Sequence, residues 1–117
     1  MILFPGYDEA CNLIDIVAFD PSTDRIGTWL GRAWALGAET LFRPRLSDDG
    51  ALPIWRSPYH WLCAACQGLV LIRPEAAVYY LEGADPVLAE DMEHGAELRR
   101  VLVRQPIEIL VPERVDR

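Results

Sequence analysis

The sequence contains no lysine, and all 11 of its cationic side chains are arginines. A chain without lysine has no Schiff-base lysine, no P-loop lysine and no kinase-type lysine. Clusters of cations are also scarce, since the formal net charge is −7. Direct binding to a nucleic-acid backbone needs such clusters, so we expect no direct nucleic-acid partner.

Long hydrophobic runs and cysteine are scarce as well. The longest uncharged apolar run, Trp61–Ile72, is about half of the roughly 20 residues that a membrane helix needs. The first ten residues, MILFPGYDEA, lack the basic start of a signal peptide. Three cysteines are an odd count, which does not indicate a disulfide framework. We therefore expect a cytoplasmic protein with reduced cysteines, no membrane contact and no cofactor.

What the chain has is the composition of a globular protein. Of its 117 residues, 51% are hydrophobic and 25% are charged, close to the average for folded domains. This length is enough to bury a core without disulfides or metal. We expect one domain over residues 1–117, with residues 112–117 as a flexible tail.

The clearest local signals lie in the stretch from Pro53 to Arg73. Ser57 is a good helix cap and Pro58 a good first helical residue, and Gly68 can end that helix. Apolar residues on both faces of Leu69–Ile72 indicate a central strand. Ala51–Trp55 is a second strand, and the short helix between the two favours a parallel crossover.

Before this stretch, Met1–Phe4 is a candidate edge strand and Asn12–Phe19 a second strand. Alternation in the second strand gives one purely apolar face, formed by Ile14, Ile16 and Ala18. The opposite face contains Asp15. From Ser22 to Leu36, apolar residues at helical spacing predict a helix.

The remaining segments complete a mixed fold. We expect a strand at Ala38–Arg43 and a turn at Leu46–Gly50. Val78–Leu81 fits either a strand or a helix, and its two tyrosines slightly favour strand. A helix should run from Pro86 to Leu102 with Asp85 as its cap, and a last strand should cover Ile107–Val111. The fold class is therefore α/β or α+β, with a small mixed sheet of about four to six strands and two or three helices.

Two sets of residues are candidates for chemistry. The pattern His60-x-x-Cys63-x-x-Cys66 resembles half of a zinc site, or a thiol beside an imidazole base. On a regular helix, however, steps of three spread the side chains around the axis. Asp15 interrupts an apolar strand, and its position looks costly. These four residues support the alternative hypothesis of a small enzyme or metal-binding protein; we expect no metal site and no catalytic residue.

Aromatic and arginine residues in the first half of the chain support the main hypothesis. Tryptophan and arginine are enriched at protein–protein hot spots, and Trp29 and Trp34 lie about 140° apart on a predicted helix, so one of them can be exposed. Charge is also uneven, because residues 75–97 contain seven acids and no arginine. We expect a protein-binding or self-associating module without catalysis. Its interface residues would be Arg25, Trp29, Arg32, Trp34 and Arg56. A further alternative is an acidic decoy for a nucleic-acid-binding protein.

One resemblance accompanies these patterns. The segments Asp15-Ile16-Val17-Ala18-Phe19-Asp20-Pro21, Trp29-Leu30-Gly31, Arg56-Ser57-Pro58, Trp61-Leu62 and Cys66-x-Gly68 resemble small uncharacterised phage- or prophage-encoded proteins of proteobacteria. The resemblance covers roughly Leu13–Leu71. It implies a bacterial, phage-related genomic setting and no particular activity.

Overall fold

The described part of the chain folds as a single domain with two β-sheets and three α-helices. The structure is a computed structural model and describes residues 1–42, 50–82 and 86–102. One sheet has three strands in the order β1-β2-β3, and the other has four strands in the order β4-β6-β5-β7. The mixed α/β class predicted from the sequence is confirmed. The strands form two sheets instead of one, because the segment after β2 turns back and pairs with β2 as a hairpin.

In chain order the elements are β1 (Ile2–Tyr7), β2 (Leu13–Asp20), β3 (Arg25–Thr28), β4 (Ala35–Leu36), the 3-10 helix η1 (Ala38–Thr40), β5 (Leu52–Trp55), α1 (Pro58–Cys63), β6 (Leu69–Leu71), α2 (Pro74–Leu81), β7 (Val87–Leu88) and α3 (Met92–Val101).

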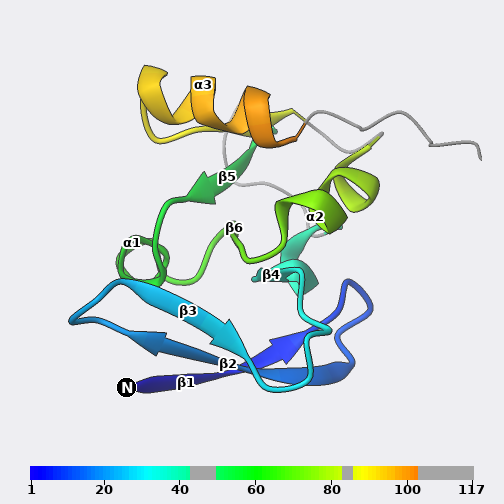
Figure 1. The fold of residues 1–117 in the computed structure, drawn as a ribbon. Helices are drawn as coiled ribbons and strands as arrows, with labels where there is room; N and C mark the ends of the chain where they lie inside the picture. The colour runs from blue at the N-terminus through cyan, green and yellow to red at the C-terminus, as the bar shows by residue number, and fades with distance from the viewer. Residues whose placement is uncertain (43–49, 83–85, 103–117) are drawn as a thin grey trace, which may run out of the picture.

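The elements stack in three layers, with the four-stranded sheet in the middle (Figure 1). One core cluster joins this sheet to the three-stranded sheet and α1, through residues such as Val17, Trp61 and Val70. A second cluster lies on its other side and includes Ala77 of α2 and Leu98 of α3. The three-stranded sheet is therefore an outer layer, with one side on the core and the other facing away from the molecule.

The central stretch folds largely as predicted. The Ser57 side chain caps α1 and Pro58 is its first residue. Strands β5 and β6 pair in parallel, with Ile54 opposite Leu69, as the short crossover predicts. The helix is shorter than expected, because it ends at Cys63 and a tight turn follows. Ala65 and Cys66 have positive φ in this turn, and Gly68 (φ 98°) leads directly into β6.

The predicted helix over Ser22–Leu36 is wrong. Arg25–Thr28 instead forms β3, which pairs antiparallel with β2, and Ala35–Leu36 forms β4. The Asp20 side chain accepts hydrogen bonds from the backbone N–H and the hydroxyl of Ser22, which stabilises a hairpin turn where we expected a helix cap. Gly27 is about 1 kcal/mol less favourable than Ala in a helix, which weakens the predicted helix at this point.

Three other local predictions also differ from the structure. The segment Ala38–Thr40 is a 3-10 helix instead of a strand, and Val78–Leu81 belongs to helix α2. Helix α3 begins at Met92 and is capped by Asp91, whose side chain accepts the N–H of His94, so Asp85 is not its cap. The predicted turn at Leu46–Gly50 falls mostly outside the described residues, and the strand at Ile107–Val111 and the tail at 112–117 fall wholly outside them.

Candidate protein-binding face and polar network

The side of the three-stranded sheet that faces away from the core is almost entirely apolar. Leu3 pairs with Ala18, Pro5 with Ile16, and Ala18 with Gly27, so their side chains point to the same side. This side, called the outer face below, consists of Leu3, Pro5, Ile14, Ile16, Ala18 and Gly27, and it ends at the charged pair of Asp20 and Arg25. Leu3 is 64% exposed and Ile16 is 37% exposed. A Cβ at Gly27 would meet no atom within 4 Å, so the face is open above this strand.

Trp29 extends the outer face at its end. Its backbone N–H donates to the carbonyl of Ile16 at 3.0 Å, which continues the β2–β3 ladder past Thr28. Residues opposite one another in antiparallel strands project to the same side, so Trp29 lies beside Ile16 on the outer face. The Trp29 side chain is 74% exposed, and the next residue, Leu30, is 49% exposed. Large exposed apolar groups thus gather at one end of the face.

Asp15 explains why the purely apolar side of β2 is the one that faces solvent. Its carboxylate is buried on the core side, between Val17 and the segment that follows β3. One oxygen accepts the N–H groups of Ile16 (2.8 Å) and Leu30 (2.7 Å), and the other accepts those of Arg32 (2.7 Å) and Ala33 (2.9 Å). Burial raises the pKa of Asp15, but these four donors outweigh it and lower the pKa to about 2. The carboxylate is therefore a structural anchor for the loop, and each of its oxygens already accepts two N–H groups.

The anchor holds the segment Trp29–Ala33 in a defined shape. Gly31 has a φ of 69°, a conformation that glycine adopts at little cost, and its carbonyl accepts a hydrogen bond from Nη1 of Arg73 at 2.7 Å. On the core side of the segment, the Asp15 carboxylate accepts the backbone N–H groups of Leu30, Arg32 and Ala33. Trp29 and Leu30 therefore lie exposed on a loop whose backbone is held by hydrogen bonds within the chain.

The five predicted interface residues do not gather on one surface. Trp29, Arg25 and Arg32 are exposed along β3 and the loop that follows. Trp34 is only 2% exposed and its ring stacks on that of Tyr80 at 4.6 Å. Arg56 follows β5 and is bound by acidic residues near α3. The outer-face residues Leu3 and Ile16 were missed by the sequence reasoning, although the alternation around Asp15 signalled them.

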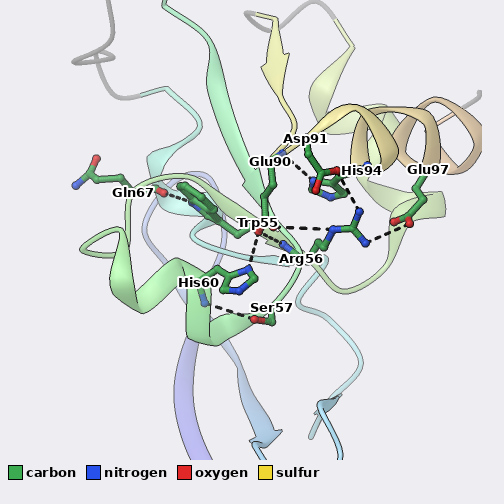
Figure 2. A network of polar contacts seen from close by, with 9 residues as sticks. All are labelled: Trp55, Arg56, Ser57, His60, Gln67, Glu90, Asp91, His94 and Glu97. Atoms are coloured by element: carbon green, nitrogen blue, oxygen red, sulfur yellow. Dashed lines mark hydrogen bonds and ion pairs between the residues drawn. The ribbon is translucent and has the colours of Figure 1, made fainter.

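Arg56 lies in a network of polar contacts between β5, α1 and α3 (Figure 2). Its guanidinium is 3.3 Å from Asp91 and 3.2 Å from Glu97, and its backbone N–H donates to Glu90 at 2.8 Å. Burial raises the pKa of Glu90, but the Arg56 N–H and His60 outweigh it and hold the pKa below its usual value. Three of the seven acids that the decoy hypothesis needs are therefore turned toward Arg56. That hypothesis stays a prediction.

Two histidines bracket Glu90 in this network. Nδ1 of His60 lies 2.8 Å from Oε1 of Glu90, while the Glu90 backbone N–H donates to Nδ1 of the buried His94 at 3.0 Å. The His94 ring therefore lies against the backbone at the start of α3, where Asp91 also accepts the His94 N–H. Through these two hydrogen bonds, Glu90 connects α1 to the start of α3.

The predicted sulfur and imidazole cluster is not a common binding centre. Cys63 is exposed at the end of α1, and Cys66 lies in the turn after it. His60, Cys63 and Glu90 line an open pocket of about 490 Å³ together with Trp55 and Ala64. Among residues 1–42, 50–82 and 86–102, no group of three or more His, Cys, Asp or Glu side chains is arranged to hold a metal ion. Asp15 lies in a different layer, bonded to its own loop.

Comparison with known proteins does not add a family. No family model, no curated protein and no solved structure matches the chain. The resemblance to phage-encoded proteins therefore stays a prediction. In the described part of the chain, no helix has the length and apolar character needed to cross a membrane.

Proposed function

We propose that this protein works by binding another protein surface, without catalysis, through the outer face of β1, β2 and β3 and the neighbouring Trp29–Leu30 loop. The observation that carries the proposal is the orientation of β2. Asp15 is buried on the core side, whereas on the opposite side Ile16 is exposed and Ile14 and Ala18 are partly exposed. A sheet that serves only as an outer layer normally presents polar residues to water. An apolar outer side gains free energy when a partner covers it.

The composition of the face and its surroundings fits this use. Trp29, Arg25 and Arg32 belong to the residue types that dominate binding energy at interfaces. No carboxylate of the described residues forms an ion pair with Arg25 or Arg32, so both guanidinium groups are available to a partner. Because Asp15 fixes the backbone beneath Trp29 and Leu30, little conformational entropy is lost there on binding.

Site-specific photo-crosslinking in the native cell tests the proposal. A photoreactive phenylalanine analogue at position 29 should form adducts with protein, and Ile16→Asp should abolish them because it places a charge in the contact. The same analogue at Tyr79, an exposed aromatic position on α2, is the matched control and should give no adduct that depends on Ile16. Adducts at position 29 that survive Ile16→Asp, or no adducts at all, would rule out docking through this face.

Thiol chemistry in the pocket beside α1 is a second candidate. The observation that favours it is Glu90, which fixes the ring of His60 through Nδ1 next to the exposed Cys63. A base held in place by a carboxylate beside a thiol is the arrangement of an activated nucleophile. Alkylation rates at neutral pH test this candidate, with the exposed Cys11 as the internal control. An activated Cys63 reacts faster than Cys11 and slows in His60→Gln; equal rates would remove the candidate.

A further inference from the structure

The start of helix α3 is closed by two side chains that bond in opposite directions (Figure 2). The Asp91 carboxylate, before the helix, accepts the backbone N–H of His94 at 2.7 Å. The ring of His94 reaches back, and its Nδ1 accepts the backbone N–H of Glu90 at 3.0 Å. This arrangement is close to a capping box, in which glutamate or glutamine supplies the acceptor that reaches back. Here that acceptor is the ring of a histidine, a side chain that titrates near neutral pH.

The His94 ring is held in place by its surroundings. Its residue is 4% exposed and lines the space between α3 and β5 together with Ile54 and Leu98, two residues of the core. Packing on these side chains keeps Nδ1 at the position from which it meets the Glu90 N–H. A change of protonation at Nδ1 therefore acts directly on the backbone at the start of α3.

The bond between His94 and Glu90 depends on the protonation of the ring. A ring nitrogen accepts an N–H only through a free lone pair, so a proton on Nδ1 removes the bond. Histidine is the side chain that ordinarily gains a proton between about pH 8 and 5. A positive charge in the first turn of a helix also opposes the helix dipole. The bond is therefore complete at the upper end of this range and is lost as the pH falls through it.

Charged groups of several elements surround the ring. They are Glu90, Asp91 and Glu97 at α3, Arg56 after β5, His60 of α1 through its contact with Glu90, and Asp24 in the turn between β2 and β3. The carboxylates among them favour a positive charge on the ring, whereas Arg56 opposes it and already pairs with Asp91 and Glu97. Protonation therefore leaves the ring among carboxylates while the Glu90 N–H loses its acceptor.

His60 responds to acid in the opposite sense. Its Nδ1 lies 2.8 Å from Oε1 of Glu90, so a proton on this nitrogen is donated to the carboxylate. Acidification thus strengthens the contact between the Glu90 side chain and α1, while it breaks the contact between the Glu90 backbone and α3. Because the two effects have opposite signs, substitution of each histidine in turn separates them.

From these contacts we infer that His94 is a pH-dependent cap of α3: protonation at its Nδ1 releases the Glu90 N–H and loosens the first turn of α3 from β5 and α1. This device goes beyond the proposed binding function, because α3 and the three-stranded sheet lie in opposite outer layers (Figure 1).

Nitrogen-15 NMR of the histidine rings and hydrogen exchange of the Glu90 amide, both on the full chain, test the inference. As the pH falls from about 8 to 5, the Nδ1 resonance of His94 should change from that of an unprotonated nitrogen to that of a protonated one. Over the same range, the protection factor of the Glu90 amide should fall about fivefold, which corresponds to one hydrogen bond of ordinary strength.

Two variants serve as controls. His94→Gln keeps an acceptor of the capping-box type that does not titrate, so the protection factor of Glu90 should change by less than about twofold over this range. His60→Gln should retain the fall seen in the unmodified chain, because the His94 ring is unchanged. The same two variants assign the two histidine ring signals.

Two results on the unmodified chain would overturn the inference, and both hold even if His94→Gln does not fold. They are an Nδ1 of His94 that already carries a proton at about pH 8, and an Nδ1 that is still unprotonated at about pH 5. An equal fall of Glu90 protection in His94→Gln would also overturn it. So would a fall that disappears in His60→Gln, since the effect would then come from α1.

Discussion

The backbone N–H of Trp29 donates to the carbonyl of Ile16 at 3.0 Å, and this bond places an exposed indole at the end of an apolar sheet face. The bond lies outside the helix that the spacing of Ile26, Trp29, Leu30 and Ala33 predicts. It ties the position of the indole to β2 and, through Asp15, to the core. The shape of the outer face and the stability of the hairpin layer therefore depend on the same few residues.

The two tryptophans of this segment should respond in opposite ways to truncation. Trp34→Ala removes a buried ring stacked on Tyr80 and is expected to lower the free energy of unfolding by about 3 to 5 kcal/mol. Trp29→Ala removes a ring that is mostly exposed to water, so the free energy of unfolding should change by less than about 0.5 kcal/mol. Urea unfolding followed by far-ultraviolet circular dichroism measures both. A destabilising Trp29→Ala would mean that this ring is part of the core.

Asp15 should be the most sensitive polar position in the hairpin layer. In Asp15→Asn the amide NH2 replaces one acceptor oxygen, so buried N–H groups that this oxygen accepts lose their partner. Each such loss costs about 1 to 3 kcal/mol, and the free energy of unfolding should fall by about 2 to 4 kcal/mol. Asp24→Asn is the matched control, because Asp24 is exposed and asparagine tolerates its φ of 57°. Equal stability of the two variants would contradict the anchoring role of Asp15.

Asp15 also predicts how stability depends on pH. Its pKa is about 2 in the folded chain, against 3.8 for an unperturbed carboxyl. The folded state thus releases the proton more readily than the unfolded state. Its contribution, about 2 kcal/mol, is complete above about pH 4 and is lost as the pH falls toward 2. The stability gap between the unmodified chain and Asp15→Asn should therefore narrow over this range, as urea titrations at a series of pH values can show. A stability difference that stays constant over this pH range would contradict the lowered pKa of Asp15.

The ion pairs of Arg56 should contribute only modestly to the free energy of unfolding. All of them are partly exposed, and pairs of this kind are weakened by solvent and salt. Arg56→Met is expected to lower the free energy of unfolding by about 1 kcal/mol at low ionic strength and by less in high salt. Arg99→Met on α3, where no described carboxylate forms an ion pair with the guanidinium, is the control. A salt-independent loss in Arg56→Met would indicate that the packing of its side chain matters more than its charge.

The sequence was informative where local chemistry decides the structure. The Ser57–Pro58 signal for the start of α1, the strands on either side of it and the limits of β2 follow from capping, alternation and turn residues. The cost of placing Asp15 in an apolar strand could also be recognised from its neighbours. These features need no information from distant parts of the chain.

The outer face could not be predicted, because the orientation of β2 depends on hydrogen-bond partners that are distant in the sequence. The backbone donors that satisfy Asp15 come from Leu30, Arg32 and Ala33, 15 to 18 residues away. In the helix that the apolar spacing suggests, those N–H groups would bond to carbonyls four residues earlier. In the structure these N–H groups bind the buried Asp15 carboxylate instead of helical carbonyls. The segment therefore forms a hairpin and an exposed loop, and not the predicted helix.

Fluorine NMR of fluorotryptophan-labelled protein tests the account most directly, with Trp29→Phe and Trp34→Phe assigning the two resonances. In a dilute sample the Trp29 resonance should show a full solvent isotope shift between H2O and D2O, and the Trp34 resonance none. A Trp29 resonance that is shielded from solvent, or a Trp34 resonance that shows an isotope shift, would contradict the account.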